Sequence, residues 1–205
     1  MTESASTQHR NPWWAVFFFG LAVLMFVLTN RTARPPAPAA PVVPPPLPLM
    51  LSNTFRLDGR LMTREATNPV SGEVLERYRD GTLKSSTVFS NGLLHGVSEG
   101  FHTNGQIQVR EFFTNGVSNG TRTKWYAGGA TQSVAEIVGG QLHGWFRRWH
   151  ENGRLAQEIP MVGGQPDGLS RAWHTNGQLK AEARLEAGRV LSQQFWDEAG
   201  QPHRP

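Results

Sequence analysis

Hydrophobic residues follow two different patterns along this chain. From Trp13 to Thr29 they form a run without a single charged residue, whereas beyond about residue 68 they alternate with polar residues in short segments. An unbroken apolar run is typical of a membrane-spanning or buried helix, and alternation is typical of strands with one solvated face. The pattern therefore predicts one N-terminal helix followed by an all-β region.

The apolar run is long enough to suggest a transmembrane helix. Its 17 residues at ~1.5 Å each span about 26 Å, near the lower limit for a bilayer core. Trp13 and Trp14 suit an interfacial anchor. A cleaved signal peptide is the alternative, but the small-residue site at residues 37–39 lies far beyond the run. We expect a tail (1–12), a transmembrane signal anchor (13–29) and, as for many such anchors, an exported C-terminal domain in the periplasm or another extracytoplasmic space.

The segment after this run is rich in proline. Residues 34–51 hold eight of the chain's 14 prolines, and polyproline II geometry would extend them over roughly 55 Å. We interpret residues 30–53 as a linker. A proline-rich ligand for an SH3-like partner is the other interpretation.

Glycines then recur at a fixed interval of 24 residues. A second glycine follows each of them after nine residues and a third after twenty. Such a period indicates a repeat array. The frame glycines are Gly72, Gly96, Gly120, Gly144 and Gly168, with Ser192 in the sixth place. The predicted boundaries are a cap and lead-in (54–71), repeats at 72–95, 96–119, 120–143, 144–167 and 168–191, a partial repeat (192–200) and a tail (201–205).

Each repeat is expected to be a β-hairpin. Asn-Gly occurs six times and Asp-Gly three times, and these dipeptides supply the two positive φ angles of a type I′ turn. Alternating apolar positions, such as Leu155 and Met161, give one aromatic and aliphatic face and one solvated face. The predicted fold is all-β: an open, single-layer antiparallel meander of 24-residue hairpins, preceded by the transmembrane helix.

An aromatic residue stands four positions before the second glycine of most repeats. These rings can form the core of the sheet, but a single layer leaves part of its apolar face accessible to an extended peptide or another partner. The candidate binding face consists of Phe101, Trp125, Tyr126, Trp149, Trp173 and Trp196.

The motifs WYAGG, WHENGRL and WHTNGQLK, with closures such as NGLLHG and GGQLHG, resemble MORN-repeat variants. Residues 68–81 are similar to the lead-in of the bacterial YwqK-type antitoxin family. The resemblance covers roughly residues 55–200. It implies stacked hairpins in an open sheet and a non-enzymatic interaction role, and the family name implies neutralisation of a partner toxin.

Charge and composition exclude several functions. Residues 51–205 carry 17 basic and 15 acidic side chains, interspersed, which argues against a nucleic-acid partner. The chain has no cysteine, and the sequence contains no catalytic or phosphate-binding motif. Equivalent histidines in adjacent repeats, such as His150 and His174, would lie about 10 Å apart on alternate strands, too far to share a zinc ion. We expect no enzyme activity, cofactor or metal.

Two classes of function stay open. The first is a membrane-tethered protein-binding or scaffold module, which includes antitoxin-like and immunity-like roles. The second is recognition of envelope lipids or glycans through the aromatic face of the sheet. The first is favoured, with a protein as partner and the N-terminal helix as membrane contact.

Overall fold

The computed structural model describes residues 47–203, and these residues are almost entirely strands. The elements are β1 (Leu49–Met50), η2 (Leu51–Asn53), β2 (Thr54–Leu57), β3 (Arg60–Thr63), β4 (Gly72–Arg77), β5 (Leu83–Ser90), β6 (Leu93–Phe101), β7 (Ile107–Thr114), β8 (Val117–Ser118), β9 (Gly120–Trp125), β10 (Thr131–Val138), β11 (Gln141–Trp149), β12 (Leu155–Val162), β13 (Gln165–Pro166), β14 (Gly168–Trp173), β15 (Leu179–Glu186), β16 (Arg189–Trp196) and β17 (Pro202–His203).

The strands from β4 onward form one open sheet in chain order. Its path is β1-β4-β5-β6-β7-β9-β10-β11-β12-β14-β15-β16-β17, with β8 and β13 as short strands paired to β7 and β12. Neighbours are antiparallel except β1, which runs parallel to β4. This sheet is an open antiparallel meander, as the sequence pattern predicts for the repeats.

The predicted transmembrane helix needs correction. No helix long and apolar enough to cross a membrane occurs among residues 47–203, where the one helical element is the three-residue η2 and a span needs about 20 residues. The predicted span, residues 13–29, lies outside the described part of the chain. The fold is therefore given as an all-β open sheet, and the predicted single-pass membrane localisation is withdrawn with the helix.

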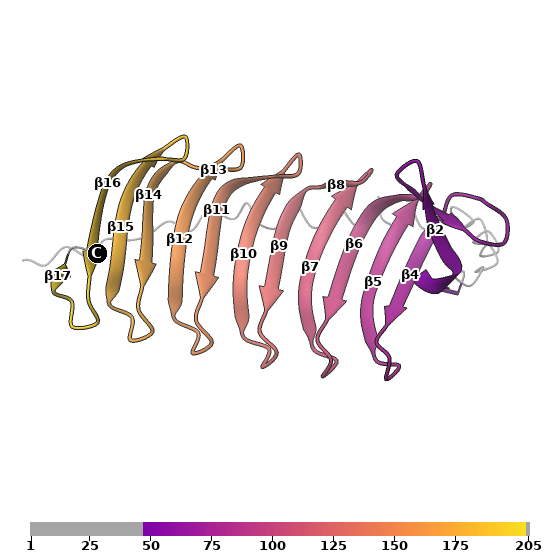
Figure 1. Cartoon of the computed structure of the whole chain (residues 1–205), viewed down its shortest axis with the longest axis horizontal. Helices are drawn as coiled ribbons and strands as arrows, with labels where there is room; N and C mark the ends of the chain where they lie inside the picture. The colour runs from indigo at the N-terminus through magenta and orange to yellow at the C-terminus, as the bar shows by residue number, and fades with distance from the viewer. Residues whose placement is uncertain (1–46, 204–205) are drawn as a thin grey trace, which may run out of the picture. The chain divides into compact units, whose positions relative to one another are not determined.

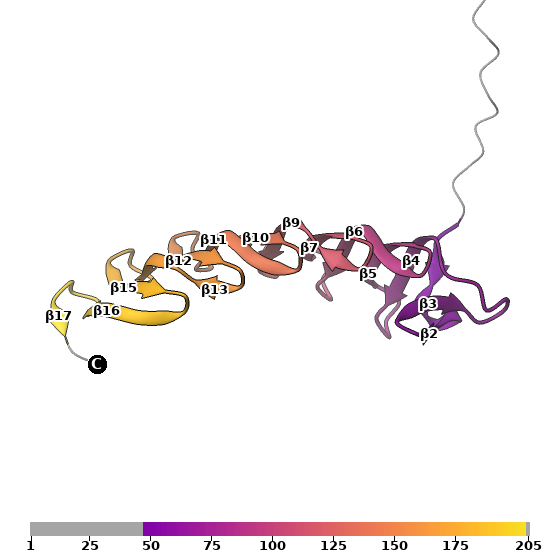
Figure 2. The same cartoon turned by 90° about the horizontal axis from the view of Figure 1, so that it is seen from above.

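A small second layer covers the first repeat. Strands β2 and β3 form a separate two-stranded sheet that lies on one side of the main sheet at its N-terminal end (Figure 2). Leu61 of β3 and Val70 are each 3% exposed and pack with Val74 and Phe89 of the first hairpin. Residues 47–71, which contain this two-stranded sheet, are called the cap, although β1 itself pairs with β4 in the main sheet. The cap includes β1 and η2, which lie in the segment expected to be linker.

Two kinds of turn reverse the chain, one at each edge of the sheet. At one edge both turn residues have positive φ, as at Asn91 (50°) and Gly92 (77°), which is the expected type I′ geometry. At the other edge Gly105 alone is positive (83°), and the side chain of Asn104 accepts a hydrogen bond from the amide of Gln106 (3.1 Å). The expectation that every Asn-Gly forms a type I′ turn is thus wrong at this second edge.

The frame glycines lie within strands or at their starts and not in the turns that reverse the chain. Gly144 has φ 86° and falls where the register between β10 and β11 shifts. Gly120 (φ 92°) opens β9. Since positive φ is strained for residues with a side chain, the 24-residue period marks one position in each repeat where the strand backbone requires glycine.

Both faces of the sheet carry apolar side chains. Phe112 and Phe113 are neighbours on β7 and therefore point to opposite faces. Phe113 is aligned with Gly96 and shares the face covered by the cap, which we call the capped face. Phe112 lies on the other face, which we call the ion-pair face for the side chains described below. The expected division into one apolar and one solvated face is too simple.

Candidate functional site

A row of ion pairs crosses the middle of the ion-pair face. In each pair an arginine and a glutamate occupy directly opposite positions on neighbouring strands. The pairs are Glu99–Arg110 at 2.6 Å, Arg147–Glu158 at 2.7 Å and Arg171–Glu182 at 2.9 Å. The third repeat has Thr123 opposite Val134 instead. Because each acid is matched by a base, this row offers polarity and directional hydrogen bonding without a net charge.

A row of exposed apolar side chains runs beside the ion pairs. Phe112 is 41% exposed, Trp145 38% and Leu169 38%. Trp145 stands opposite Pro160, and the guanidinium carbon of Arg147 lies 5.2 Å from the centroid of the Trp145 ring. Arg147 thus pairs with Glu158 and also contacts an aromatic ring, a cation–π contact.

The predicted aromatic residues form a third row. It lies next to the turns of the second edge, such as the five-residue turn His102–Gln106. All six are half-buried. Trp149 is aligned with Leu155 and Trp173 with Leu179. Alternation along β11 places Trp149 on the same face as Trp145 and Arg147. The ion-pair face therefore combines Trp149 and its equivalents in the other repeats with the ion pairs and the exposed apolar row.

Tyr126, one of the candidate binding residues, has a structural contact. Its hydroxyl donates a hydrogen bond to the carbonyl oxygen of Trp149 in the next repeat (2.8 Å). Equivalent residues do the same along the array. Tyr78 bonds to the carbonyl of Phe101, and the Nε2 atoms of His102, His150 and His174 lie 2.9–3.0 Å from the carbonyls of Trp125, Trp173 and Trp196. This column ties successive hairpins together.

Two further columns link the repeats at their turns. The side-chain amide of Asn152 donates to the carbonyl of Thr175 (2.9 Å), and Asn104 and Asn176 make equivalent bonds. At the opposite edge the side chain of Asn119 accepts from the amide of Gly139 (2.8 Å). Asparagines and histidines that suggested turns or ligands by sequence alone therefore hold neighbouring repeats in register.

No metal site is found in the part of the chain that the structure describes: residues 47–203 bring no three His, Asp or Glu side chains together around a possible ion. His95 sits at a type I′ turn, where its Nδ1 lies 3.5 Å from the amide of Asn115.

Two pKa shifts arise in the first repeat. Hydrogen bonds from the hydroxyl and amide of Thr82 (2.7 and 2.9 Å) lower the pKa of the Asp80 carboxyl. A hydrogen bond to Glu76 (2.8 Å) and the attraction of its charge raise the pKa of Lys84. Both groups are exposed parts of a turn and a strand, so they indicate local order and do not mark a reactive site.

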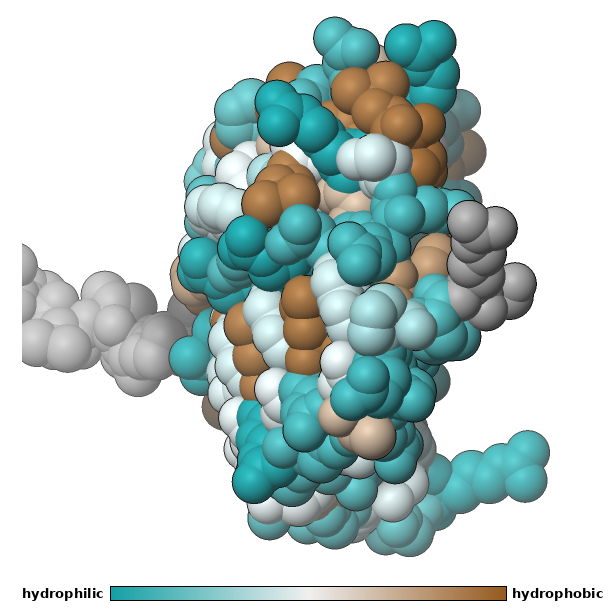
Figure 3. Space-filling model, turned by 90° about the vertical axis from the view of Figure 1, so that its left-hand side faces the viewer, coloured by the Kyte–Doolittle hydropathy of each residue, from teal (hydrophilic) through white to brown (hydrophobic). Residues whose placement is uncertain are grey.

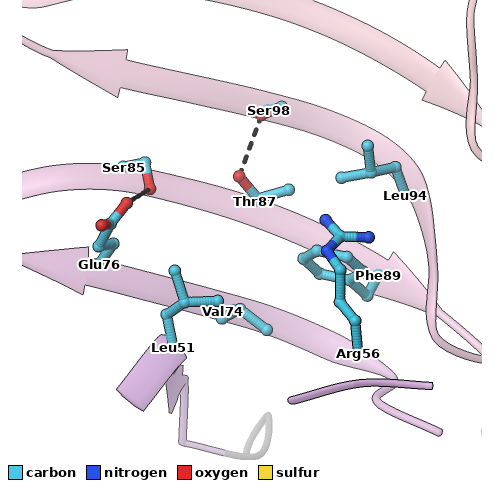
Figure 4. Close-up of a pocket in the computed structure, with 9 residues that line it drawn as sticks. All are labelled: Leu51, Arg56, Val74, Glu76, Ser85, Thr87, Phe89, Leu94 and Ser98. Atoms are coloured by element: carbon cyan, nitrogen blue, oxygen red, sulfur yellow. Dashed lines mark hydrogen bonds between the residues drawn. The ribbon is translucent and has the colours of Figure 1, made fainter. Parts of the chain in front are cut away.

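A cavity lies between the cap and the capped face (Figure 4). It has a volume of about 180 Å³, smaller than a typical site for a drug-sized ligand. Its lining is Leu51, Arg56, Val74, Glu76, Ser85, Thr87, Phe89, Leu94 and Ser98. The Oγ atoms of Thr87 and Ser98 bond to each other across neighbouring strands (3.0 Å), so part of the polar lining is already satisfied.

The exposed residues Phe112, Trp145 and Leu169 were missed by sequence reasoning. Trp145 and Leu169 each follow a frame glycine, whereas Phe112 stands directly before Phe113, so three different residue types occupy these places. The position of the Trp145 ring next to the Arg147–Glu158 ion pair became apparent only from the register of the strands. The available signal was Trp145 itself, a tryptophan outside the repeated tryptophan position.

Comparison with known families gives one match. The MORN repeat variant family matches residues 94–115 and 166–185, which correspond to β6–β7 and β13–β15. No curated protein sequence matches the chain. The MORN-like character of the repeats is thereby supported at two positions, whereas the narrower resemblance to YwqK-type antitoxins receives no support.

Proposed function

We propose that the repeat array is a non-enzymatic protein-binding module and that its docking surface is the ion-pair face. MORN repeats are generally involved in binding proteins or membrane lipids, so a binding role agrees with the family match. Toxin neutralisation, implied by the antitoxin resemblance, would be one narrow form of it.

The observation that carries the proposal is the composition of this face. Trp145, Phe112 and Leu169 are exposed beside arginines whose guanidinium groups are held in place by glutamates. Tryptophan and arginine are the residues most enriched in the energetic centres of protein interfaces. Because the arginines are ordered by their ion pairs, less side-chain entropy is lost when a partner binds.

The charge pattern favours a protein over a lipid surface. Anionic membranes attract clusters of unpaired lysine and arginine, whereas Arg110, Arg147 and Arg171 each have an acidic partner. A protein surface can match alternating charges by local complementarity.

The test uses the full chain as bait in cross-linked capture from cells of the source organism, followed by affinity measurement with the purified partner. Replacing Phe112 and Trp145 by serine should weaken binding about 30-fold or more, the scale of losing an aromatic hot spot. The control replaces Leu57 by serine, because Leu57 is also exposed (47%) but lies on β2 of the cap, on the other side of the sheet.

Equal affinity of the Phe112 and Trp145 double variant and of the Leu57 variant for the partner would contradict the proposed docking surface. Binding of the chain to vesicles or glycans, with the same loss in the Phe112 and Trp145 variant and no protein partner, would favour the lipid or glycan alternative instead.

A further inference from the structure

The last long strand of the sheet has an open edge. β17 pairs with β16 only at Phe195 and Trp196. From Arg189 to Gln194 no strand among residues 47–203 lies on the outer side of β16, and all six residues are exposed. The opposite edge differs, since β4 is paired with β1 and its hairpin is covered by the cap.

This open edge lacks the features that normally prevent strand pairing. Exposed edges are usually short, charged, or interrupted by proline. β16 is eight residues long, carries Arg189 as its one charged residue and contains no proline. Val190 and Leu191 are 49% and 48% exposed. In the end-on view of Figure 3, apolar side chains gather at the upper edge, the edge at which β16 begins.

We propose that β16 pairs with β16 of a second copy of the chain, in antiparallel orientation, so that two sheets join into one. Opposite residues of an antiparallel pair point to the same face. The two-fold axis must therefore lie between two copies of one residue, which face each other. With the axis at Ser192 the paired segment is Val190–Gln194, because Arg189 would face Phe195, which already pairs with β17. Val190 then lies opposite Gln194, and Leu191 opposite Gln193.

The charges along β16 and the symmetry of the pair both favour this self-pairing. No two like charges face each other in this register, because Arg189 lies outside the paired segment. A head-to-tail arrangement would need the edge of β4, which β1 and the cap occupy. A two-fold pair uses the same open edge on both copies and leaves the capped ends outside, so assembly stops at a dimer.

A shallow cavity beside β16 gives the partner strand a place to pack. It measures about 140 Å³ and lies on the ion-pair face at the C-terminal end of the sheet. Its lining is Leu169, Glu182, Arg184, Ser192, Gln193 and Gln194. Half of these residues belong to the open strand, so a second β16 would lie directly against the cavity.

The first test uses the absence of cysteine from the chain. In the full chain, Ser192→Cys places two thiols opposite each other on the two-fold axis, within the range of Cα distances that a disulfide spans. Mild oxidation should convert most of this variant into a disulfide-linked dimer. Val138→Cys is the matched control, because Val138 is 61% exposed on β10 and lies far from the axis. Equal cross-linking of the two variants would overturn the proposal.

The second test changes the charge at the axis. Ser192→Glu puts two carboxylates opposite each other in the dimer, whereas in a single copy the new carboxylate lies opposite Arg184. The dimer dissociation constant, from analytical ultracentrifugation of the full chain, should rise by at least about tenfold. Ser192→Gln, similar in size and uncharged, should leave it nearly unchanged. A monomeric wild type at about 100 µM, or a dimer unaffected by Ser192→Glu, would overturn the inference.

Discussion

The two ends of the sheet follow one sequence pattern but differ in how they are stabilised. At the N-terminal end, Val74 and Phe89 are 3% and 7% exposed because the cap packs against them. At the C-terminal end Leu185 stands where Phe89 stands in the first repeat, aligned with a frame glycine, yet it is only half-buried. The same repeat unit therefore contributes a well-buried core at one end and little burial at the other.

The comparison shows that the hairpins alone do not build a deep core. No large side chain among residues 47–203 is fully buried, and the middle repeats bury mainly small or single aliphatic residues such as Ala135 (2%) and Ile137 (4%). In repeat arrays, the free energy of unfolding is approximately the sum of contributions from each repeat and from each interface between neighbouring repeats. We expect the array to open first at β15–β16 and last beside the cap.

The largest expected difference comes from matched leucines. Leu61→Ala removes a side chain that is 3% exposed in the cap cluster and should lower the free energy of unfolding by about 3 kcal/mol. Leu185→Ala removes the same atoms from a half-buried site and should cost only about 1 kcal/mol. Urea denaturation measures both, and similar losses would contradict the contrast between the ends.

Two turn glycines sharpen the same comparison. A Cβ on Gly92 would lie 2.8 Å from the Cβ of Arg60 and 2.9 Å from the carbonyl oxygen of Leu61, whereas at Gly188 the nearest atom is 3.8 Å away. Both have positive φ, 77° and 80°, so alanine should cost about 1–2 kcal/mol at either site. The clash should add about 1–3 kcal/mol at Gly92 alone. Thermal unfolding of the two variants distinguishes them.

The bonds between repeats should matter less than burial. Tyr126→Phe removes the hydroxyl that donates to the carbonyl of Trp149 and should cost about 1 kcal/mol. Hydrogen exchange should then increase at the two turns that this bond joins. Tyr78→Phe is the counterpart beside the cap, where the bond to Phe101 measures 2.7 Å. No change in exchange in either variant would show that the column does not hold the turns.

Ion pairs should contribute little to stability even though they order the ion-pair face. Arg147 and Glu158 side chains are 41% and 21% exposed, so a double-mutant cycle should give a coupling of about 0.5 kcal/mol that falls with added salt. A coupling of several kcal/mol would mean that these side chains serve folding first and binding second.

The smallest effect concerns pH at the first turn. The pKa of Asp80 is lowered by hydrogen bonds from Thr82, so its contribution to stability is present above the pKa of the unfolded chain and is lost as pH falls through the folded value. Thr82→Val should raise the pKa of Asp80 in an NMR titration. An unchanged pKa would assign the shift to other groups.

Sequence reasoning reached the repeat architecture because the glycine period reports a backbone requirement that is local to each strand. It missed which face each side chain occupies, because the extra residue between Leu155 and Gln157 shifts the register against Trp149 and Arg148. Asn91 and Asn104 begin the same dipeptide but lie in turns of different length. A cap at residues 54–71 was expected, but its packing was not predicted, because Leu61 and Phe89 meet only through long-range packing.

The column of bonds from Tyr or His to the next repeat joins residues 22 or 23 positions apart. Each bond thus depends on the spacing between two neighbouring repeats and not on how many repeats precede or follow them. A gene that gains or loses a whole 24-residue unit would keep every remaining bond, whereas an insertion of one or two residues would break the column at that point. Evolution can therefore lengthen or shorten the proposed docking surface in whole steps while the end that carries the cap stays the same.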